Sequence, residues 1–81
     1  MPKAPLARQI GSAIRTRRER RQISQESFAD EIHMHRTYYS AIERGEKNLQ
    51  LSTLLRVCEG LGVPVWEVLK DAESPEYRVS R

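Results

Sequence analysis

Apolar residues recur every three or four positions along most of the chain, and alternation of apolar and polar residues is nearly absent. This spacing is typical of helices that bury one face, so we predict an all-α domain. Glycine, proline and helix-capping residues interrupt the pattern and divide it into five helices. The first four helices are expected at residues 6–21, 25–32, 35–44 and 51–61, and a short fifth helix begins near Pro64.

Several boundaries carry their own signals. Ser24 is expected to cap the start of the second helix, because its hydroxyl can accept a hydrogen bond from a free backbone N–H. Gly45 suits the left-handed position just after the third helix, and Pro64 suits the first turn of the fifth. The predicted domain covers residues 1–71, and residues 72–81 form a tail that we expect to be mobile or ordered by a partner.

The apolar faces of the first and fourth helices follow from their spacing. Leu6, Ile10 and Ile14 step by four residues. The apolar stripe of the fourth helix consists of Leu51, Leu54, Leu55, Cys58 and Leu61. Cys58 is therefore expected to be a buried structural thiol, which is a more frequent role than redox sensing.

Arg18 continues the step of four along the first helix, which places a guanidinium at the edge of the core. A desolvated arginine needs a carboxylate partner. Glu43, at the inward edge of the third helix, is the expected partner. We predict a partly buried Arg18–Glu43 ion pair that orients the third helix against the first.

The third helix, within HRTYYSAIERG, has two chemically different faces. At about 100° per residue, its apolar side is formed by Met34, Tyr38, Tyr39 and Ile42. The opposite side has a cation at each end and small residues between, namely Arg36, Thr37, Ser40, Ala41 and Arg44.

Such a stripe fits the major groove of B-DNA, because an α-helix is about 10–12 Å across and small side chains let its backbone approach the bases. Arginine can donate two hydrogen bonds to guanine, and Thr and Ala methyl groups can contact the thymine methyl. We expect the stripe to face base edges and phosphates. On this stripe alone, an ordinary solvent-facing helix is an equal alternative.

Two residues at helix starts are candidates for phosphate contact. Gln25 lies in the first turn of the second helix, where free backbone N–H groups attract anions and the amide adds a donor. His35 begins the third helix and is expected to lie close to a phosphate. Gln is also simply common near helix starts, so the position of Gln25 gains weight only beside the third helix.

The charge distribution favours an anionic partner. The chain of 81 residues carries a formal charge of +3, but residues 1–44 hold nine basic and five acidic residues, whereas residues 45–81 hold five and six. A basic front half suggests nucleic acid or a membrane surface. A membrane-surface role is disfavoured, because Arg18 interrupts the face that would enter lipid.

Other classes of function find little support in the sequence. No apolar run reaches the length of a membrane span, and the single cysteine excludes an intrachain disulfide, so a cytoplasmic protein is expected. His33 and His35 lack further ligands at metal spacing, so no metal site is expected. No catalytic motif, cofactor loop or small-molecule substrate site is evident, and we expect no enzyme and no cofactor.

The segment SQESFADEIHMHRTYYSAIERGEKN, residues 24–48, resembles the helix-turn-helix core of lambda-repressor-like DNA-binding domains of the Cro/cI or XRE type. The similarity covers about residues 6–70. Within that family the chain looks most like the controller proteins of restriction–modification systems, which act as dimers and switch transcription of their own operon. The resemblance implies a compact five-helix fold in which the second and third helices form the helix-turn-helix.

The resemblance also implies roles for individual residues. Base-contacting positions match Arg36, Thr37 and Ala41, with Ser40 beside them. Phosphate-contacting positions match Gln25, Tyr38, Arg44, Lys47 and Asn48. The Arg18–Glu43 pair matches a structural ion pair of the family. The chain departs from the family pattern at His33, where glycine is usual, and at Gln50, where Ser or Thr often caps the fourth helix.

We therefore predict a sequence-specific regulator that binds double-stranded DNA as a homodimer on a pseudo-palindromic operator. The dimer surface is expected to lie on the fifth helix and its surroundings, at Leu61, Val63, Val65, Trp66 and Leu69. The alternative is an antitoxin or another interaction module that uses the same fold chiefly to bind a protein. A co-purifying toxin would favour that alternative.

Overall fold

The computed structural model describes residues 5–73 and folds them into five α-helices, with no strand in that range. They are α1 (Leu6–Arg20), α2 (Gln25–Glu31), α3 (Arg36–Glu43), α4 (Leu51–Leu61) and α5 (Val65–Glu73). The all-α fold and the order of the five helices are as the sequence predicts, and each predicted helix overlaps an observed one.

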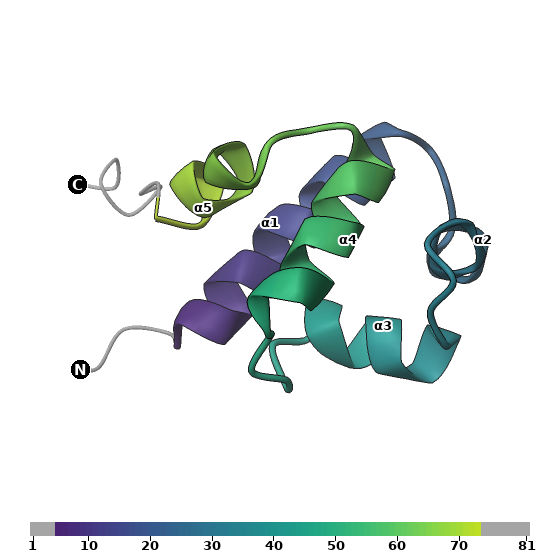
Figure 1. The fold of residues 1–81 in the computed structure, drawn as a ribbon, viewed down its shortest axis with the longest axis horizontal. Coiled ribbons are helices and arrows are strands. Elements are labelled where there is room, and N and C mark those ends of the chain that lie inside the picture. Colours follow the sequence, from purple (N-terminus) through teal and green to yellow (C-terminus); the bar gives the residue numbers. More distant parts are fainter. Residues whose placement is uncertain (1–4, 74–81) are drawn as a thin grey trace.

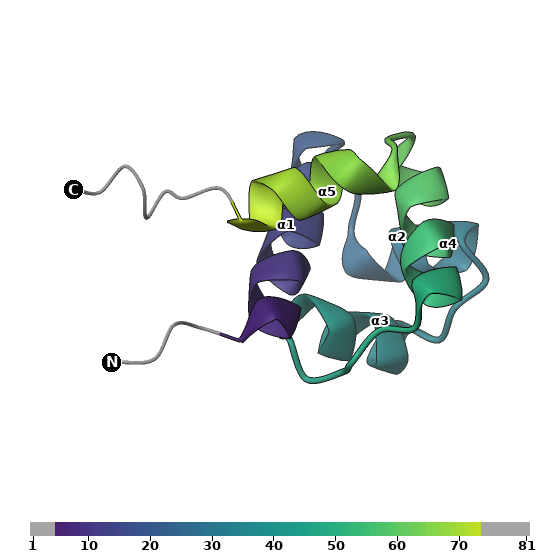
Figure 2. The same ribbon diagram turned by 60° about the vertical axis from the view of Figure 1, so that its left-hand side comes forward.

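The helix α1 is the centre of the packing, since it contacts α3, α4 and α5. Figures 1 and 2 show α3 on one side of the pair formed by α1 and α4, and α5 on the other side. The short helix α2 packs against α3. The core between the helices consists of Ile10, Ala13, Ile14, Phe28, Ala29, Ile32, Tyr39, Ile42, Leu54, Val57, Cys58, Leu61, Val68 and Ala72.

The ends of α2 and α3 are built in the same way. Each helix stops at a residue in the left-handed conformation, His33 with φ 57° and Gly45 with φ 76°. Beyond these, the N–H of Met34 donates to the carbonyl of Ala29 at 2.9 Å, and the N–H of Glu46 donates to that of Ala41 at 2.9 Å. Both turns therefore satisfy carbonyls that the helix itself leaves free.

The predicted caps are only partly observed. Ser24 caps α2, since its hydroxyl accepts a hydrogen bond from the N–H of Ser27 at 3.0 Å. Gly45 occupies the predicted left-handed position, where an added Cβ would overlap the backbone of Arg8. Gln50 precedes α4 without a side-chain capping bond. The start of α4 therefore relies on packing rather than on a capping side chain.

Two predicted apolar faces need correction at their first turns. Ile10 and Ile14 are buried as expected, but Leu6, the first residue of α1, is 52% exposed. In α4 the buried positions are Leu54, Val57, Cys58 and Leu61, whereas Leu51 and Leu55 are exposed. The core-facing stripe of α4 is thus rotated relative to the predicted one.

The domain extends past its predicted end at residue 71. Ala72 is buried and Glu73 still belongs to α5, so both residues belong to the fold rather than to the tail. Arg17 fastens this helix to α1 through an ion pair with Asp71, with 2.8 Å between Nε and Oδ2. The rest of the predicted tail, residues 74–81, lies outside the described residues.

Candidate nucleic-acid interface

A buried ion pair joins the first helix to the third. The Nε of Arg18 donates to one oxygen of the Glu43 carboxylate at 2.6 Å, and its Nη2 donates to the other at 3.1 Å. The two residues are 8% and 7% exposed, so water reaches the pair poorly. The predicted bidentate pair is therefore present, and it is more deeply buried than expected.

Two further donors complete the environment of the Glu43 carboxylate. The hydroxyl of Tyr39 donates to one oxygen, and the amide Nε2 of Gln25 donates to the other at 2.8 Å. Arg18 uses its remaining terminal nitrogen to bind the carbonyl of Ile23 at 2.7 Å. This network, formed by Arg18, Gln25, Tyr39 and Glu43, joins α1, α2 and α3 and fixes the turn between α1 and α2.

The network keeps Glu43 ionised. Burial raises the pKa of the carboxyl, but hydrogen bonds from Arg18, Tyr39 and Gln25 outweigh burial and hold the pKa below its usual value. The hydrogen bond to Glu43 also raises the pKa of Arg18 against the effect of burial. Burial and the Glu43 carboxylate raise the pKa of Tyr39, which therefore remains a neutral donor. The charges of the pair thus persist at neutral pH.

Gly11 brings the backbones of α1 and α3 together at the same place. A Cβ on Gly11 would overlap the carbonyl of Ile42 and come within 2.6 Å of the carbonyl oxygen of Glu43. The end of α3 therefore lies directly on the α1 backbone, beside the buried pair. Backbone contact and ion pair together hold α3 at a fixed angle to α1.

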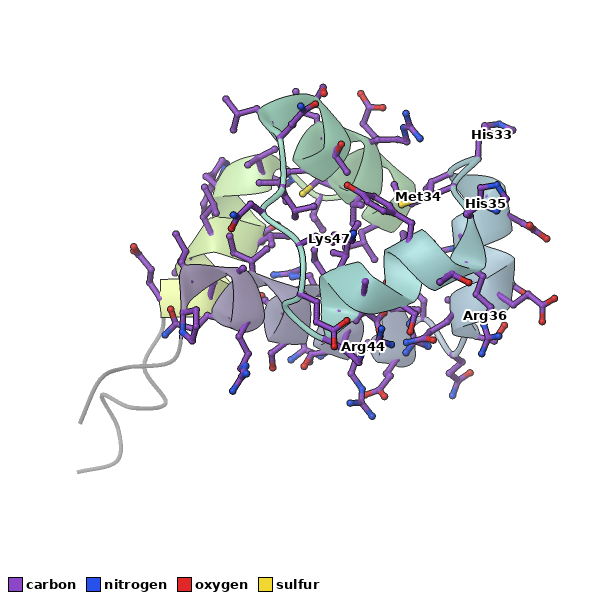
Figure 3. The ribbon with its side chains drawn as sticks, turned by 90° about the horizontal axis from the view of Figure 1, so that it is seen from below. His33, Met34, His35, Arg36, Arg44 and Lys47 are labelled. Atoms are coloured by element: carbon purple, nitrogen blue, oxygen red, sulfur yellow. The ribbon has the colours of Figure 1, made fainter. Side chains whose placement is uncertain are left out.

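The surface of α3 opposite the network is open to solvent. Arg36, Thr37 and Arg44 are exposed, and Ser40 between them is half-buried. Figure 3 shows Arg36 and Arg44 near opposite ends of α3. Arg36 makes no ion pair with any residue in the range 5–73. We call these four residues, Arg36, Thr37, Ser40 and Arg44, the outer face of α3.

Two predictions for α3 are wrong in direction. The sequence predicts that Tyr38 points inward, yet it is 36% exposed, with the Lys47 ammonium 5.5 Å from its ring centroid. Only its neighbour Tyr39 enters the core, because successive side chains of a helix are about 100° apart. Ala41, predicted to contact bases, is only 6% exposed. Its methyl group therefore offers almost no surface to a partner.

A comparison with known proteins gives the family. A family model described as helix-turn-helix matches residues 14–65. Control protein C.MunI from Mycoplasma sp is 46% identical over 57 residues, which cover 70% of this chain and 77% of that protein. The chain belongs to the helix-turn-helix family. The family resemblance drawn from residues 24–48 is confirmed.

Solved structures of helix-turn-helix proteins share the fold. The clp gene regulator ClgR from C. glutamicum has a TM-score of 0.84 at 31% identity, covering 88% of this chain and 91% of that one. The restriction-modification controller protein C.Esp1396I, solved as a tetramer in complex with its natural 35 base-pair operator, has a TM-score of 0.77 at 29% identity. That match covers 89% of this chain and 100% of the controller.

In this helix-turn-helix protein, the predicted phosphate-contacting residues lie at the start of α2, on α3, and just before and after α3 along the chain. His35 precedes the helix and makes no capping bond with its side chain, and Lys47 and Asn48 follow it on exposed positions. Gln25 is half-buried, and one of its two amide hydrogens is committed to Glu43. The hydrogen bond from Gln25 to Glu43 is not predictable from the sequence, because the two residues lie on different helices with no shared periodicity.

Arg44 of the helix-turn-helix unit also has partners that the sequence did not reveal. Its Nε and Nη2 donate to the two carboxylate oxygens of Glu46, each at 2.9 Å. Its Nη1 donates to the hydroxyl of Ser40 at 2.6 Å. An acid two residues after an arginine is a weak signal, since it becomes a pair only through the left-handed turn at Gly45.

The predicted dimer surface is only partly accessible. Trp66 is 62% exposed, whereas Val63, Val65 and Leu69 are partly buried against the core. Leu61 is 9% exposed and belongs to the core, so the structure corrects its assignment to the interface. It falls on the inner stripe of α4 that begins at Leu54.

Within residues 5–73, no helix is both long enough and apolar enough to cross a membrane. The same range contains no group of three or more His, Cys, Asp or Glu side chains placed to hold a metal ion.

Proposed function

We propose that this chain, a DNA-binding transcriptional regulator, reads a pseudo-palindromic operator as a homodimer, with α3 of each copy in the major groove. It acts as a regulator and not as an enzyme, and it works in the cytoplasm. Base contacts are assigned to Arg36, Thr37 and Ser40. Phosphate contacts are assigned to Gln25, His35, Tyr38, Arg44, Lys47 and Asn48.

The outer face of α3 is the observation that carries this proposal. Arg36 has no ion-pair partner among residues 5–73, and its exposed guanidinium is therefore available for a guanine edge. The side chains of Thr37 and Ser40 are short, so the helix backbone can approach base edges closely. The buried network behind α3 keeps this surface in place without help from DNA.

Rigidity behind the outer face supports specific rather than general binding. Reading bases requires hydrogen-bond donors to be held in position to within a fraction of an ångström. In the free protein, the angle of α3 to α1 and its distance from α1 are set by the Arg18–Glu43 pair and by Gly11. Because α3 is already ordered in the free protein, DNA binding does not have to supply the free energy of ordering it, and contacts with DNA can discriminate between bases.

The homodimer follows from the small reach of one helix. One copy of α3 contacts only a few base pairs, whereas two copies on half-sites about 34 Å apart supply the affinity of a typical operator complex. The relative C.Esp1396I, which was solved as a tetramer on its operator, supports assembly on DNA.

Selection from a random duplex library tests the proposal. The purified chain is expected to enrich sites with two related half-sites in opposite orientation, and the footprint should span more than one helical turn. Arg36→Ala should lose the base preference at one position of each half-site. Enrichment of no sequence, with equal affinity for every duplex, would contradict a sequence-specific function.

A further inference from the structure

Arg44 is held within its own molecule in the absence of DNA. The fork of its guanidinium, Nε and Nη2, faces both oxygens of Glu46 at 2.9 Å each, and its third nitrogen binds Ser40 at 2.6 Å. All three residues belong to the last turn of α3 and the loop that follows it. The cation proposed to contact DNA phosphate thus already has an anionic partner.

The fold, and not chance, places the Glu46 carboxylate there. Gly45 adopts a φ of 76°, which turns the chain back over the end of α3. The N–H of Glu46 donates to the Ala41 carbonyl at 2.9 Å, and that of Gly45 donates to the Ile42 carbonyl at 3.0 Å. These backbone bonds fix the position from which the Glu46 side chain reaches Arg44.

A carboxylate and a phosphate bind a guanidinium through the same two-oxygen edge. We propose that Glu46 occupies Arg44 as an intramolecular competitor of DNA phosphate and thereby sets the affinity of the protein for DNA. This inference rests on the proposed function. The residues assigned above favour DNA binding, whereas Glu46 weakens it.

The pair is suited to exchange rather than to stability. The side chains of Arg44 and Glu46 are 53% and 57% exposed, so the pair is worth little to folding and opens readily. The hydrogen bond from Arg44 lowers the pKa of Glu46, so the competitor is charged at neutral pH. When phosphate replaces it, Glu46 is released beside the DNA backbone, where its charge opposes binding.

Glu46→Gln is the variant that tests the proposal, with binding measured by fluorescence anisotropy on a selected operator and on a random duplex. We expect affinity to rise by about two- to fivefold on both duplexes, because the energy of one exposed pair no longer opposes binding. The plot of log affinity against log salt should steepen by about one charge. Glu59→Gln is the matched control, since Glu59 lies exposed on α4 without an ion pair in the described range, and it should change neither quantity.

The same Glu46→Gln comparison, repeated in the background of Arg44→Ala, separates competition for Arg44 from simple repulsion of DNA by Glu46. Competition for Arg44 predicts that most of the gain from Glu46→Gln disappears once Arg44 is absent. A gain of the same size in that background, or no gain in the wild-type background, would overturn the inference while leaving the proposed function intact. Failure of every variant, and of the wild type, to bind any duplex at low salt would overturn both.

Discussion

Glu43 accepts hydrogen bonds from side chains of α1, of α2 and of its own helix α3, in a place that water barely reaches. Such a carboxylate cannot be removed without leaving Arg18 buried and unpaired. Glu43→Gln should therefore lower the free energy of unfolding by about 3–5 kcal/mol, measured by chemical denaturation. Glu31→Gln, which breaks an exposed pair with Arg21, is the matched control and should cost less than about 1 kcal/mol.

The same carboxylate makes a pH-dependent contribution to stability. Because the folded-state pKa of Glu43 is lowered, its contribution is fully present above the unfolded value near 4.5 and is lost as the pH falls through the folded value. The difference in unfolding free energy between wild type and Glu43→Gln should thus shrink below about pH 4.5. A difference that stays constant down to pH 2 would contradict an ionised Glu43.

His33 carries strain that glycine would relieve. Its φ of 57° brings the side chain close to the backbone, at a cost of about 1–2 kcal/mol for a residue with a Cβ. His33→Gly should raise the free energy of unfolding by about 1 kcal/mol, after allowance for the greater freedom of glycine in the unfolded chain. His33→Ala keeps a Cβ in the strained position and should bring no gain, which thermal denaturation of both variants can check.

At the scale of the helices, periodicity was sufficient to find each element and several of its inward residues. The step of four from Ile10 through Ile14 reaches Arg18, and all three residues are buried. The same step placed Arg18 beside Glu43, because a guanidinium at the edge of a core requires a carboxylate. Strong spacing and an energetic requirement together made this part of the site predictable.

Predictions failed where a helix has apolar residues on more than one side. In α4 the sequence LSTLLRVCEGL allows several stripes, and the packing of α4 against α1 and α5 decides that Val57 faces inward and Leu55 does not. The adjacent Tyr38 and Tyr39 posed the same problem. The pair between Arg44 and Glu46 could not be predicted either, since it depends on the backbone turn at Gly45.

The two ends of α3 should contribute to DNA binding in different ways. Arg36→Ala should cost about 1–3 kcal/mol on the operator and relax the preference at one base pair. Arg44→Ala should weaken binding to all duplexes alike and flatten the salt dependence, by less than one charge because Glu46 is released when Arg44 binds phosphate. Because Arg44 must first leave Glu46, its loss should cost less than that of Arg36. Equal losses on operator and random DNA for both variants would contradict this division.

At the scale of the whole molecule, the surface proposed to face DNA and the surface proposed to face the second copy are kept apart. Figure 2 shows α3 and α5 on opposite sides of the helix pair α1 and α4. Nine of the basic residues lie in residues 1–44, which include α1, α2 and α3, whereas the part that includes α5 carries more acidic than basic residues. The proposed dimer through α5 would leave α3 of each copy free, and it would reduce repulsion between the basic surfaces of the two copies.

Trp66 provides the test of this arrangement. It is 62% exposed on α5, and large exposed aromatic side chains contribute strongly to interfaces when a partner covers them. Trp66→Ala should raise the dimer dissociation constant by about tenfold or more in sedimentation equilibrium, while the fold is maintained because the side chain lies mostly outside the core. Leu55→Ala, at a 50% exposed position on α4, is the control and should leave the dimer unchanged.

Affinity for a duplex with two half-sites should fall in the Trp66 variant, whereas affinity for a single half-site should not. An unchanged dissociation constant would place the contact between copies on another surface. An equal loss of affinity for both duplexes would mean that the substitution of Trp66 disturbs DNA binding by the single copy.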